Sequence, residues 1–134
     1  MLTNEERDVV VAAMRKIYIA GPMTGHVGFN HKSFDFAAEY FRDEGWNVIN
    51  PVDLDIESGG PCIRSLPSGT DWNKMPDGLI KDEVIRRDVD AVMKADAIAL
   101  LIGWGNSVGA RAEASLARWR GLDVFYANVD FPAS

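Results

Sequence analysis

The chain has 134 residues, of which 47% are hydrophobic and 25% are charged, so it is long enough for one domain with one hydrophobic core. Its formal net charge of −6 argues against binding along a nucleic-acid polymer. No apolar run approaches the length of a membrane span, the N-terminus lacks a signal-peptide layout, and the single cysteine, Cys62, excludes an intramolecular disulfide. We therefore expect a cytoplasmic protein that does not act at a membrane.

A capped helix is predicted at the start of the chain, from Thr3 to Arg15. Thr3 and Glu6 have the spacing of a capping box, and acidic residues fill the first turn. The valines and alanines of this segment form an apolar stripe, so we expect the helix to pack on the body of the protein or on a neighbouring subunit. Lys16–Ala20 then reads as a β-branched and aromatic strand that ends at Gly21 and Pro22.

A β-α-β unit is predicted next. Asn30–Glu44 is expected to be a helix with one apolar face, and Gly45 is expected to stop it. Trp46–Asn50 has the character of a strand and is closed by Pro51. Because the crossover of such a unit is right-handed, the two strands should lie parallel in one sheet.

The segment from Val52 to Gly78 loses hydrophobic periodicity and collects prolines and glycines. A loop of this length without regular structure is uncommon in a compact domain and is often functional. We therefore expect a mobile lid, with Trp72 as its anchor.

The second half of the chain predicts a helix from Leu79 to Lys94, a buried strand at Ala97–Ile102, a helix from Ser107 to Gly121 and a last strand at Leu122–Ala127. Alternating helices and strands favour an α/β fold. We expect a single-domain, flavodoxin- or Rossmann-like open parallel sheet of four to five strands, in the order 2-1-3-4 and flanked by helices. Ligands bind such sheets at the carboxyl ends of the strands.

The turn GWGNSVG leads from the buried strand into the next helix and suits an anion. Ser107 is a candidate N-cap, and the backbone N–H groups of Val108 and Gly109 would be unpaired donors at the positive end of the helix dipole. A phosphate is the simplest anion for such a place. Glu113 follows six residues after Ser107, and a carboxylate beside an anion site indicates a chemical role.

The loop GPMTGHVG, after the first strand, is the second candidate wall of a site, because its glycines allow backbone amides to approach a ligand. This loop also contains His26. A lone histidine is more often a surface or loop residue than a catalyst, although a protonated histidine could bind a phosphate. The chain has no histidine–cysteine–aspartate cluster at metal spacing, and its glycines fit neither a dinucleotide nor a triphosphate motif. We expect no metal and no cofactor.

Two aspartates lie near the end of the predicted helix from Leu79 to Lys94: Asp88 within it and Asp96 just after it. Asp96 is expected to be structural, at the entry to the buried strand. Asp88 lies late in the predicted helix, where its charge opposes the helix dipole. Its side chain would hold a hydroxyl-rich ligand if it points into the cleft, and the sequence leaves this open. The preceding Arg86 and Arg87 read as a solvated face.

Three segments together resemble the nucleoside 2-deoxyribosyltransferase superfamily, and within it the deoxynucleoside 5′-monophosphate N-glycosidases. The first is IYIAGPMTG, which is similar to the family's opening strand and glycine-rich loop. The second is DVDAVMKAD, an aspartate followed eight residues later by the Ala-Asp pair that starts the next strand. The third is SVGARAE, which resembles the family's serine-to-glutamate turn and helix, with Ala112 in place of the usual aromatic.

The resemblance implies catalytic roles for three residues. Glu113 would be the nucleophile that attacks the anomeric carbon of the sugar, and Tyr18 would hydrogen-bond and position that carboxylate. Asp88 would contact the sugar or assist the departing base.

The resemblance also implies how substrate is held. Ser107, the amides of Val108 and Gly109, and the loop from Gly21 to Gly25, which contains Met23 and Thr24, would bind the 5′-phosphate. The family is typically oligomeric and shares residues between subunits. We therefore expect a homo-oligomer, a dimer or higher, in which Asn128 contributes to a neighbour's site.

The function expected from these residues is cleavage of the N-glycosidic bond of a (deoxy)nucleoside 5′-monophosphate, with release or exchange of the base. A nearby carboxylate stabilises the oxocarbenium-like transition state and can trap the sugar covalently. Two alternatives remain open. One is an inactive nucleotide-binding sensor, suggested by Ala112 and by the absence of a clear general acid. The other is a 2-deoxyribosyltransferase acting on unphosphorylated nucleosides.

Overall fold

Four parallel strands form one sheet in the order β2-β1-β3-β4 in the computed structural model, which describes residues 1–133. The strands are β1 (Lys16–Ala20), β2 (Asn47–Ile49), β3 (Ala97–Leu100) and β4 (Asp123–Tyr126). The central strand β3 is buried along its whole length, as expected for an apolar run without helical periodicity. The expected α/β class and strand order are confirmed.

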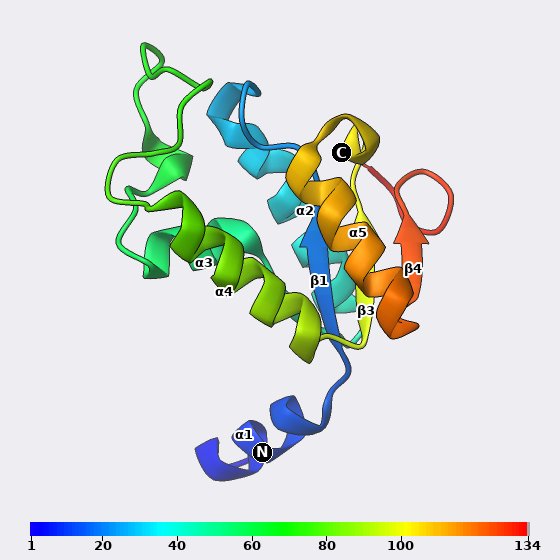
Figure 1. Cartoon of the computed structure of the whole chain (residues 1–134). Coiled ribbons are helices and arrows are strands. Elements are labelled where there is room, and N and C mark those ends of the chain that lie inside the picture. Colours follow the sequence, from blue (N-terminus) through cyan, green and yellow to red (C-terminus); the bar gives the residue numbers. More distant parts are fainter. Residues whose placement is uncertain (134) are drawn as a thin grey trace.

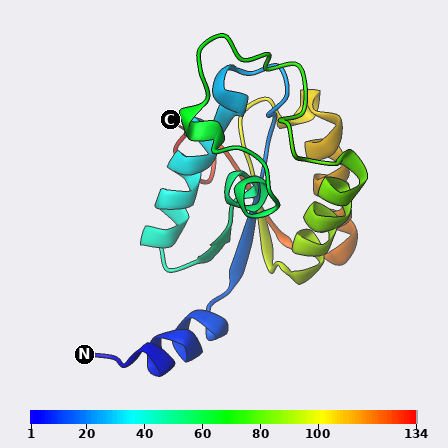
Figure 2. The same cartoon turned by 90° about the vertical axis from the view of Figure 1, so that its left-hand side faces the viewer.

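Helices cover both faces of the sheet, as Figure 2 shows almost edge-on. The helix α2 (His31–Asp43) packs on one face through Phe34, Ala37, Ala38 and Phe41, the apolar face predicted from the sequence. The helices α4 (Lys81–Lys94) and α5 (Val108–Arg120) pack on the other face. Tyr18 of β1 points to this second face because successive strand residues alternate between faces. No helix among residues 1–133 has the length and hydropathy needed to cross a bilayer.

The N-terminal helix α1 (Asn4–Ala13) projects away from the sheet (Figure 1). The predicted capping box is present, because the Thr3 side chain accepts from the Glu6 N–H and the Glu6 side chain accepts from the Thr3 N–H. No residue of α1 is buried, so the expected packing on the body of the same chain is wrong. The extended backbone at Met14 (φ −69°, ψ 143°) separates the helix from β1 and directs it outward.

The segment from Val52 to Gly78 is more ordered than predicted. It begins within the helix α3 (Pro51–Glu57), which Asn50 caps by accepting a hydrogen bond from the Val52 N–H. The sequence reading took Pro51 as the end of a strand, but proline is also favoured at the first position of a helix. A short 3-10 helix, η2 (Ile63–Ser65), follows, and Arg64 pairs with carboxylates of α2 and α3.

The rest of this segment, residues 66–78, has no helix or strand and passes over the carboxyl edge of the sheet. Trp72 anchors it as predicted: its ring packs edge-on against Phe29 with centroids 5.2 Å apart, and its carbonyl accepts a hydrogen bond from the Gly25 N–H. Mobility of this lid remains a prediction.

Asp88 of α4 and Asp96, the residue before β3, have different surroundings. Asp96 accepts a hydrogen bond from the Lys16 N–H at 2.8 Å, which confirms its structural role at the start of β3. Asp88 is in the middle of α4 and not late in it, because the helix begins at Lys81 and ends at Lys94. The dipole of α4 therefore has little influence on this carboxylate, since the dipole acts mainly within the terminal turns.

Candidate active site

A cavity of about 430 Å³ lies at the carboxyl edge of the sheet. Its walls come from the end of β1, the loop after β1, the helix α3, the segment before α4, one side of α4 and the first turns of α5. This is the edge at which parallel α/β sheets bind ligands. The sheet topology thus brings together side chains that are far apart in the sequence.

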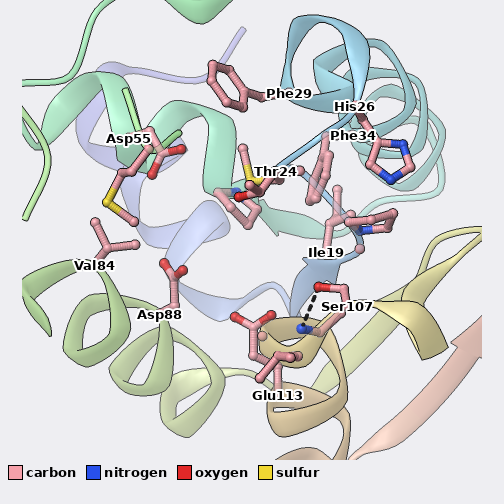
Figure 3. A pocket seen from close by; sticks show the side chains of 18 of the residues that line it. Ile19, Thr24, His26, Phe29, Phe34, Asp55, Val84, Asp88, Ser107 and Glu113 are labelled. Carbon is pink, nitrogen blue, oxygen red and sulfur yellow. Dashed lines mark hydrogen bonds between the residues drawn. The ribbon is translucent and has the colours of Figure 1, made fainter. Parts of the chain in front are cut away.

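Most of the residues predicted for the site line this cavity. The lining residues among them are Tyr18, Gly21, Met23, Thr24, Asp88, Ser107, Val108, Gly109 and Glu113. Figure 3 shows Asp88 from α4 and Glu113 from α5 projecting into the same space, with Asp55 and Val84 on one side and Ser107 on the other. The uncertainty over Asp88 is therefore resolved: it faces the cavity.

Two predicted residues do not line the cavity. Gly25 adopts a positive φ of 84° and donates its N–H to Trp72, so it holds the lid segment in place. Asn128 lines a separate, smaller hollow near the C-terminus, and its side-chain oxygen accepts from the Ala133 N–H at 3.1 Å. A contribution of Asn128 to a neighbour's site stays a prediction.

Tyr18 and Glu113 form the inner wall of the cavity. The Tyr18 hydroxyl donates a hydrogen bond to Oε2 of Glu113. Burial, and then the nearby Glu113 carboxylate, raise the pKa of Tyr18 well above its ordinary value, so the phenol stays neutral and remains a donor. The predicted positioning contact between these two residues is present in the structure.

The Glu113 carboxyl holds a proton more strongly than an exposed glutamate. Burial raises its pKa to about 8; the Tyr18 hydrogen bond opposes this rise, and the negative charge of Asp88 adds to it. At neutral pH Glu113 is therefore mainly protonated. A strongly raised pKa in an enclosed cavity is typical of a carboxyl group that takes part in catalysis.

An ion-pair network that the sequence reading did not identify supports Asp88. Arg87 donates from Nε and Nη2 to Oδ1 of Asp88 at 2.9 and 2.8 Å, and from Nη2 to Oδ1 of Asp55 at 2.7 Å. Its Nη1 donates to the Ser58 hydroxyl at 3.2 Å. The side chains of Arg87, Asp55 and Asp88 are only 17%, 7% and 19% exposed. The reading of Arg87 as part of a solvated face is therefore wrong.

The two carboxyls beside Arg87 also resist ionisation. Burial raises the pKa of Asp88 to about 6, even though Arg87 opposes the rise, and the Asp55 carboxylate contributes to it. Burial raises the pKa of Asp55 as well, again against the influence of Arg87. Asp88 and Glu113 thus differ in proton affinity although they face one cavity, and pairs of this kind indicate acid–base chemistry.

The far end of the cavity has the features of an anion site. Ser107 is the N-cap of α5, and its hydroxyl accepts from the Ala110 N–H at 3.2 Å. The Val108 and Gly109 N–H groups belong to the first turn and have no carbonyl partner within the helix. Thr24 and His26 also line the cavity, whereas no lysine or arginine among residues 1–133 does. Backbone amides and the helix dipole would therefore supply most of the attraction for an anion.

Asp55 and Arg87 are the functional candidates that sequence reasoning missed. The signal for Asp55 was present in Asn50-Pro51, because a cap followed by proline begins a helix that carries its first and fifth residues, Pro51 and Asp55, toward the same side. Arg87 adjoins Asp88 in sequence, but only the packing of α3 against α4 shows that the pair is buried. The sequence alone could not supply that contact.

No group of three or more histidine, cysteine, aspartate or glutamate side chains in residues 1–133 is arranged to hold a metal ion. Cys62 is exposed and is not among the residues that line the cavity. The chemistry available to the cavity is therefore argued from its carboxyls, its phenol and its backbone amides.

Comparisons with known proteins agree with this architecture. No curated protein sequence matches the chain. Among solved structures, the chain is similar to a 2-desoxiribosyltransferase from Leishmania mexicana, with a TM-score of 0.54 and 16% sequence identity over 84% of this chain and 63% of that chain. The chain thus spans less than two thirds of that protein, and the likeness shows a shared fold. Residues 15–126 match the family model described as "Domain of unknown function (DUF4406)", so the chain belongs to the DUF4406 family.

Proposed function

We propose that this protein cleaves the N-glycosidic bond of a (deoxy)nucleoside 5′-monophosphate. The observation that carries the proposal is the Glu113 carboxyl, which accepts a hydrogen bond from Tyr18 and shares its cavity with Asp88 and with the first turn of α5. The fold of a protein named as a 2-desoxiribosyltransferase supports it. Cleavage by such a site needs a carboxylate at the anomeric carbon, a proton for the base and a place for the phosphate.

The proposed reaction has two steps. In the first, ionised Glu113 attacks the anomeric carbon, the carbon–nitrogen bond breaks, and its electron pair passes to the base, which takes a proton from Asp88. In the second, water attacks the glycosyl–Glu113 ester and gives up a proton to Asp88, and the sugar 5′-phosphate leaves. A second base in place of water would yield a new nucleotide by the same step.

The protons of the two carboxyls decide when the reaction can begin. At neutral pH the two carboxyls share one proton, mainly on Glu113, because the pKa of Glu113 is about 8 and that of Asp88 is about 6. The reactive form needs that proton on Asp88 instead. Both arrangements carry the same total number of protons, so the pair should titrate as one unit.

A bell-shaped pH profile is therefore expected for kcat/KM, with its maximum between about pH 6 and pH 8. Below that range both carboxyls are protonated and Glu113 cannot attack. Above it both are ionised and the base receives no proton. Each limb should fall about tenfold per pH unit. Steady-state rates in buffers of constant ionic strength measure this, and a rate that rises steadily beyond pH 9 would remove the acid role from Asp88.

Substitution of Ser107 by alanine is expected to raise KM for a monophosphate about tenfold, because one hydrogen bond to a charged group is worth about 1.5–3 kcal/mol. The KM for the matching unphosphorylated nucleoside should rise much less. Ser115→Ala, an exposed serine of the same helix, is the control and should leave both constants unchanged. An equal rise in KM for the two substrates would mean that the phosphate does not bind at Ser107.

The proposal is tested by a chromatographic screen for free base. Purified protein is incubated with each ribo- and deoxynucleoside 5′-monophosphate, modified pyrimidines included, with Glu113→Ala as the control. Release of a base by the wild type alone supports the proposal and names the substrate. Sugar phosphate formed in water alone indicates hydrolysis, whereas a new nucleotide on addition of a second base indicates transfer.

An unphosphorylated nucleoside is the second candidate substrate, because no lysine or arginine of residues 1–133 lines the cavity. The same screen with nucleosides distinguishes the two. A panel without turnover, together with nucleotide binding that survives Glu113→Ala, would instead favour a nucleotide sensor.

A further inference from the structure

The cavity has two chemically different ends, and Glu113 lies between them. Figure 3 shows Ser107 on one side of Glu113, and Asp88, Val84 and Asp55 on the other. With the phosphate at Ser107 and the anomeric carbon at Glu113, as in the proposed function, the base extends toward Asp55. The end of the cavity at Asp55 and Val84, which we call the base end, would therefore contact the part of the substrate that differs between nucleotides.

The walls of the base end are mostly apolar. Val84 comes from α4, and the segment just before α4 contributes Met75 and Leu79. Leu79 lies close to Asp55, because a Cβ atom placed on Gly60 would be 2.9 Å from the Asp55 carbonyl oxygen and 3.1 Å from the Leu79 side chain. Such walls suit the flat apolar faces of a base, and they leave its polar edge to a small number of groups.

Asp55 has one carboxylate oxygen that is free to contact a ligand. Its Oδ1 accepts from Nη2 of Arg87 at 2.7 Å, and this is the only hydrogen bond of the Asp55 side chain among residues 1–133. Every fully buried side-chain oxygen or nitrogen in that range has a hydrogen-bond partner. Oδ2 of Asp55 has none, so it is not fully buried and is accessible from the cavity that Asp55 lines.

Arg87 fixes the direction of this free oxygen. Its guanidinium holds Oδ1 of both Asp55 and Asp88 from behind, since Arg87 itself is not among the residues that line the cavity. The positive charge of Arg87 also favours the ionised form of Asp55, and an ionised carboxylate only accepts hydrogen bonds. The two aspartates therefore present fixed acceptors to the base.

A fixed carboxylate acceptor distinguishes bases by the group that faces it. The exocyclic amino group of cytosine or adenine donates, whereas the carbonyl that replaces it in uracil or hypoxanthine turns lone pairs toward the carboxylate. We propose that Asp55 is a specificity-determining residue that selects substrates whose base carries an amino group, by accepting a hydrogen bond from that group at Oδ2. The inference rests on the proposed function, because it requires a nucleotide with its phosphate at Ser107.

Two pairs of nucleotides that exchange this amino group for a carbonyl test the proposal. Binding of cytidine against uridine 5′-monophosphate, and of adenosine against inosine 5′-monophosphate, is measured by isothermal titration calorimetry in the ribo and deoxy forms. The protein carries Glu113→Gln, so that turnover does not interfere. The amino member of at least one pair should bind about tenfold or more tightly. Equal affinities within both pairs, or tighter binding of the carbonyl members, would overturn the proposal.

Asp55→Asn, added to Glu113→Gln, should shift the preference toward the carbonyl member. The amide oxygen can still accept from Arg87, and the amide N–H groups replace Oδ2 and donate to a carbonyl. The ratio of the two dissociation constants should change by about tenfold or more. Asp53→Asn is the matched control, because Asp53 lies on the same helix and pairs with Arg64 at 2.7 Å but does not line the cavity.

An unchanged ratio in folded Asp55→Asn, or an equal change in the Asp53→Asn control, would overturn the role of Asp55. Circular dichroism shows whether Asp55→Asn is folded. If it is not, the matched nucleotide pairs on the chain that keeps Asp55 still decide the proposal.

Turnover separates this inference from the proposed function. Base release at equal rates from the amino and carbonyl members would overturn the role of Asp55 and leave the proposed reaction intact. A binding preference that depends on Asp55, without base release by the wild type, would support the role of Asp55 and overturn the proposed reaction. Absence of binding by every nucleotide would overturn both.

Discussion

Replacement of Glu113 by glutamine is expected to lower base release by about 10³-fold or more, because the amide cannot form the glycosyl ester. Glutamine has the same shape and its oxygen can still accept the Tyr18 hydrogen bond, so the cavity should keep its geometry and its affinity for substrate. Single-turnover measurements with a substrate found by the screen separate the lost chemistry from binding. Glu39→Gln, an exposed glutamate of α2, is the control.

The stability of the same variant distinguishes lost chemistry from lost folding. An unfolded glutamate ionises near pH 4.5, whereas folded Glu113 keeps its proton up to about pH 8. The stability that this group contributes is therefore complete below pH 4.5 and is lost as the pH rises through about 8. Glutamine does not ionise, so Glu113→Gln should have a higher Tm than the wild type in alkaline buffer. A variant that is both inactive and less stable at alkaline pH would contradict this assignment.

The sequence predicted the sheet because its signals are local. The strand Lys16–Ala20, the apolar face of α2 and the cap at Ser107 each depend on residues within one element, and all are present in the structure. The strand order also followed, since the β-α-β connections leave few alternatives. The positions of Tyr18, Asp88 and Glu113 around one cavity then follow from the carboxyl edge of that sheet.

The errors concern contacts between distant segments. Pro51 reads equally as the end of a strand and the start of a helix, and only the packing of Val52 in the core decides for α3. Arg87 lies on a helix that looks solvated until α3 covers it with Asp55. The amphipathic sequence of α1 predicts a helix but does not say what it packs against. Each error is a case in which tertiary structure determines burial that no local pattern encodes.

Removal of the Arg87 guanidinium is expected to have the largest effect on stability. Arg87→Met keeps much of the apolar stem but leaves Asp55 and Asp88 without their shared partner, two buried carboxylates within one network. Loss of one member of a buried ion pair costs about 3–5 kcal/mol. Because these side chains are slightly exposed, we expect the lower end, about 3 kcal/mol at pH 8, measured by urea unfolding.

The pH dependence of that loss tests its electrostatic origin. As the pH falls through about 6, Asp88 takes up a proton. Burial also raises the pKa of Asp55, so this carboxyl becomes neutral at a higher pH than an exposed aspartate. The variant should therefore regain most of its lost stability at pH 5, because neutral carboxyls need no cation. Arg15→Met, which removes an exposed ion pair with Asp123, is the control and should cost less than about 1 kcal/mol at either pH.

The same substitution links the network to the proposed chemistry. Arg87 lowers the pKa of Asp88 and thereby opposes the rise caused by burial. Without it, Asp88 should keep its proton to a higher pH, so the acidic limb of the kcat/KM profile should move upward from about pH 6. A loss of stability without any movement of that limb would make Arg87 a structural residue alone. Movement of the limb in the expected direction would make it the residue that sets the proton affinity of the acid.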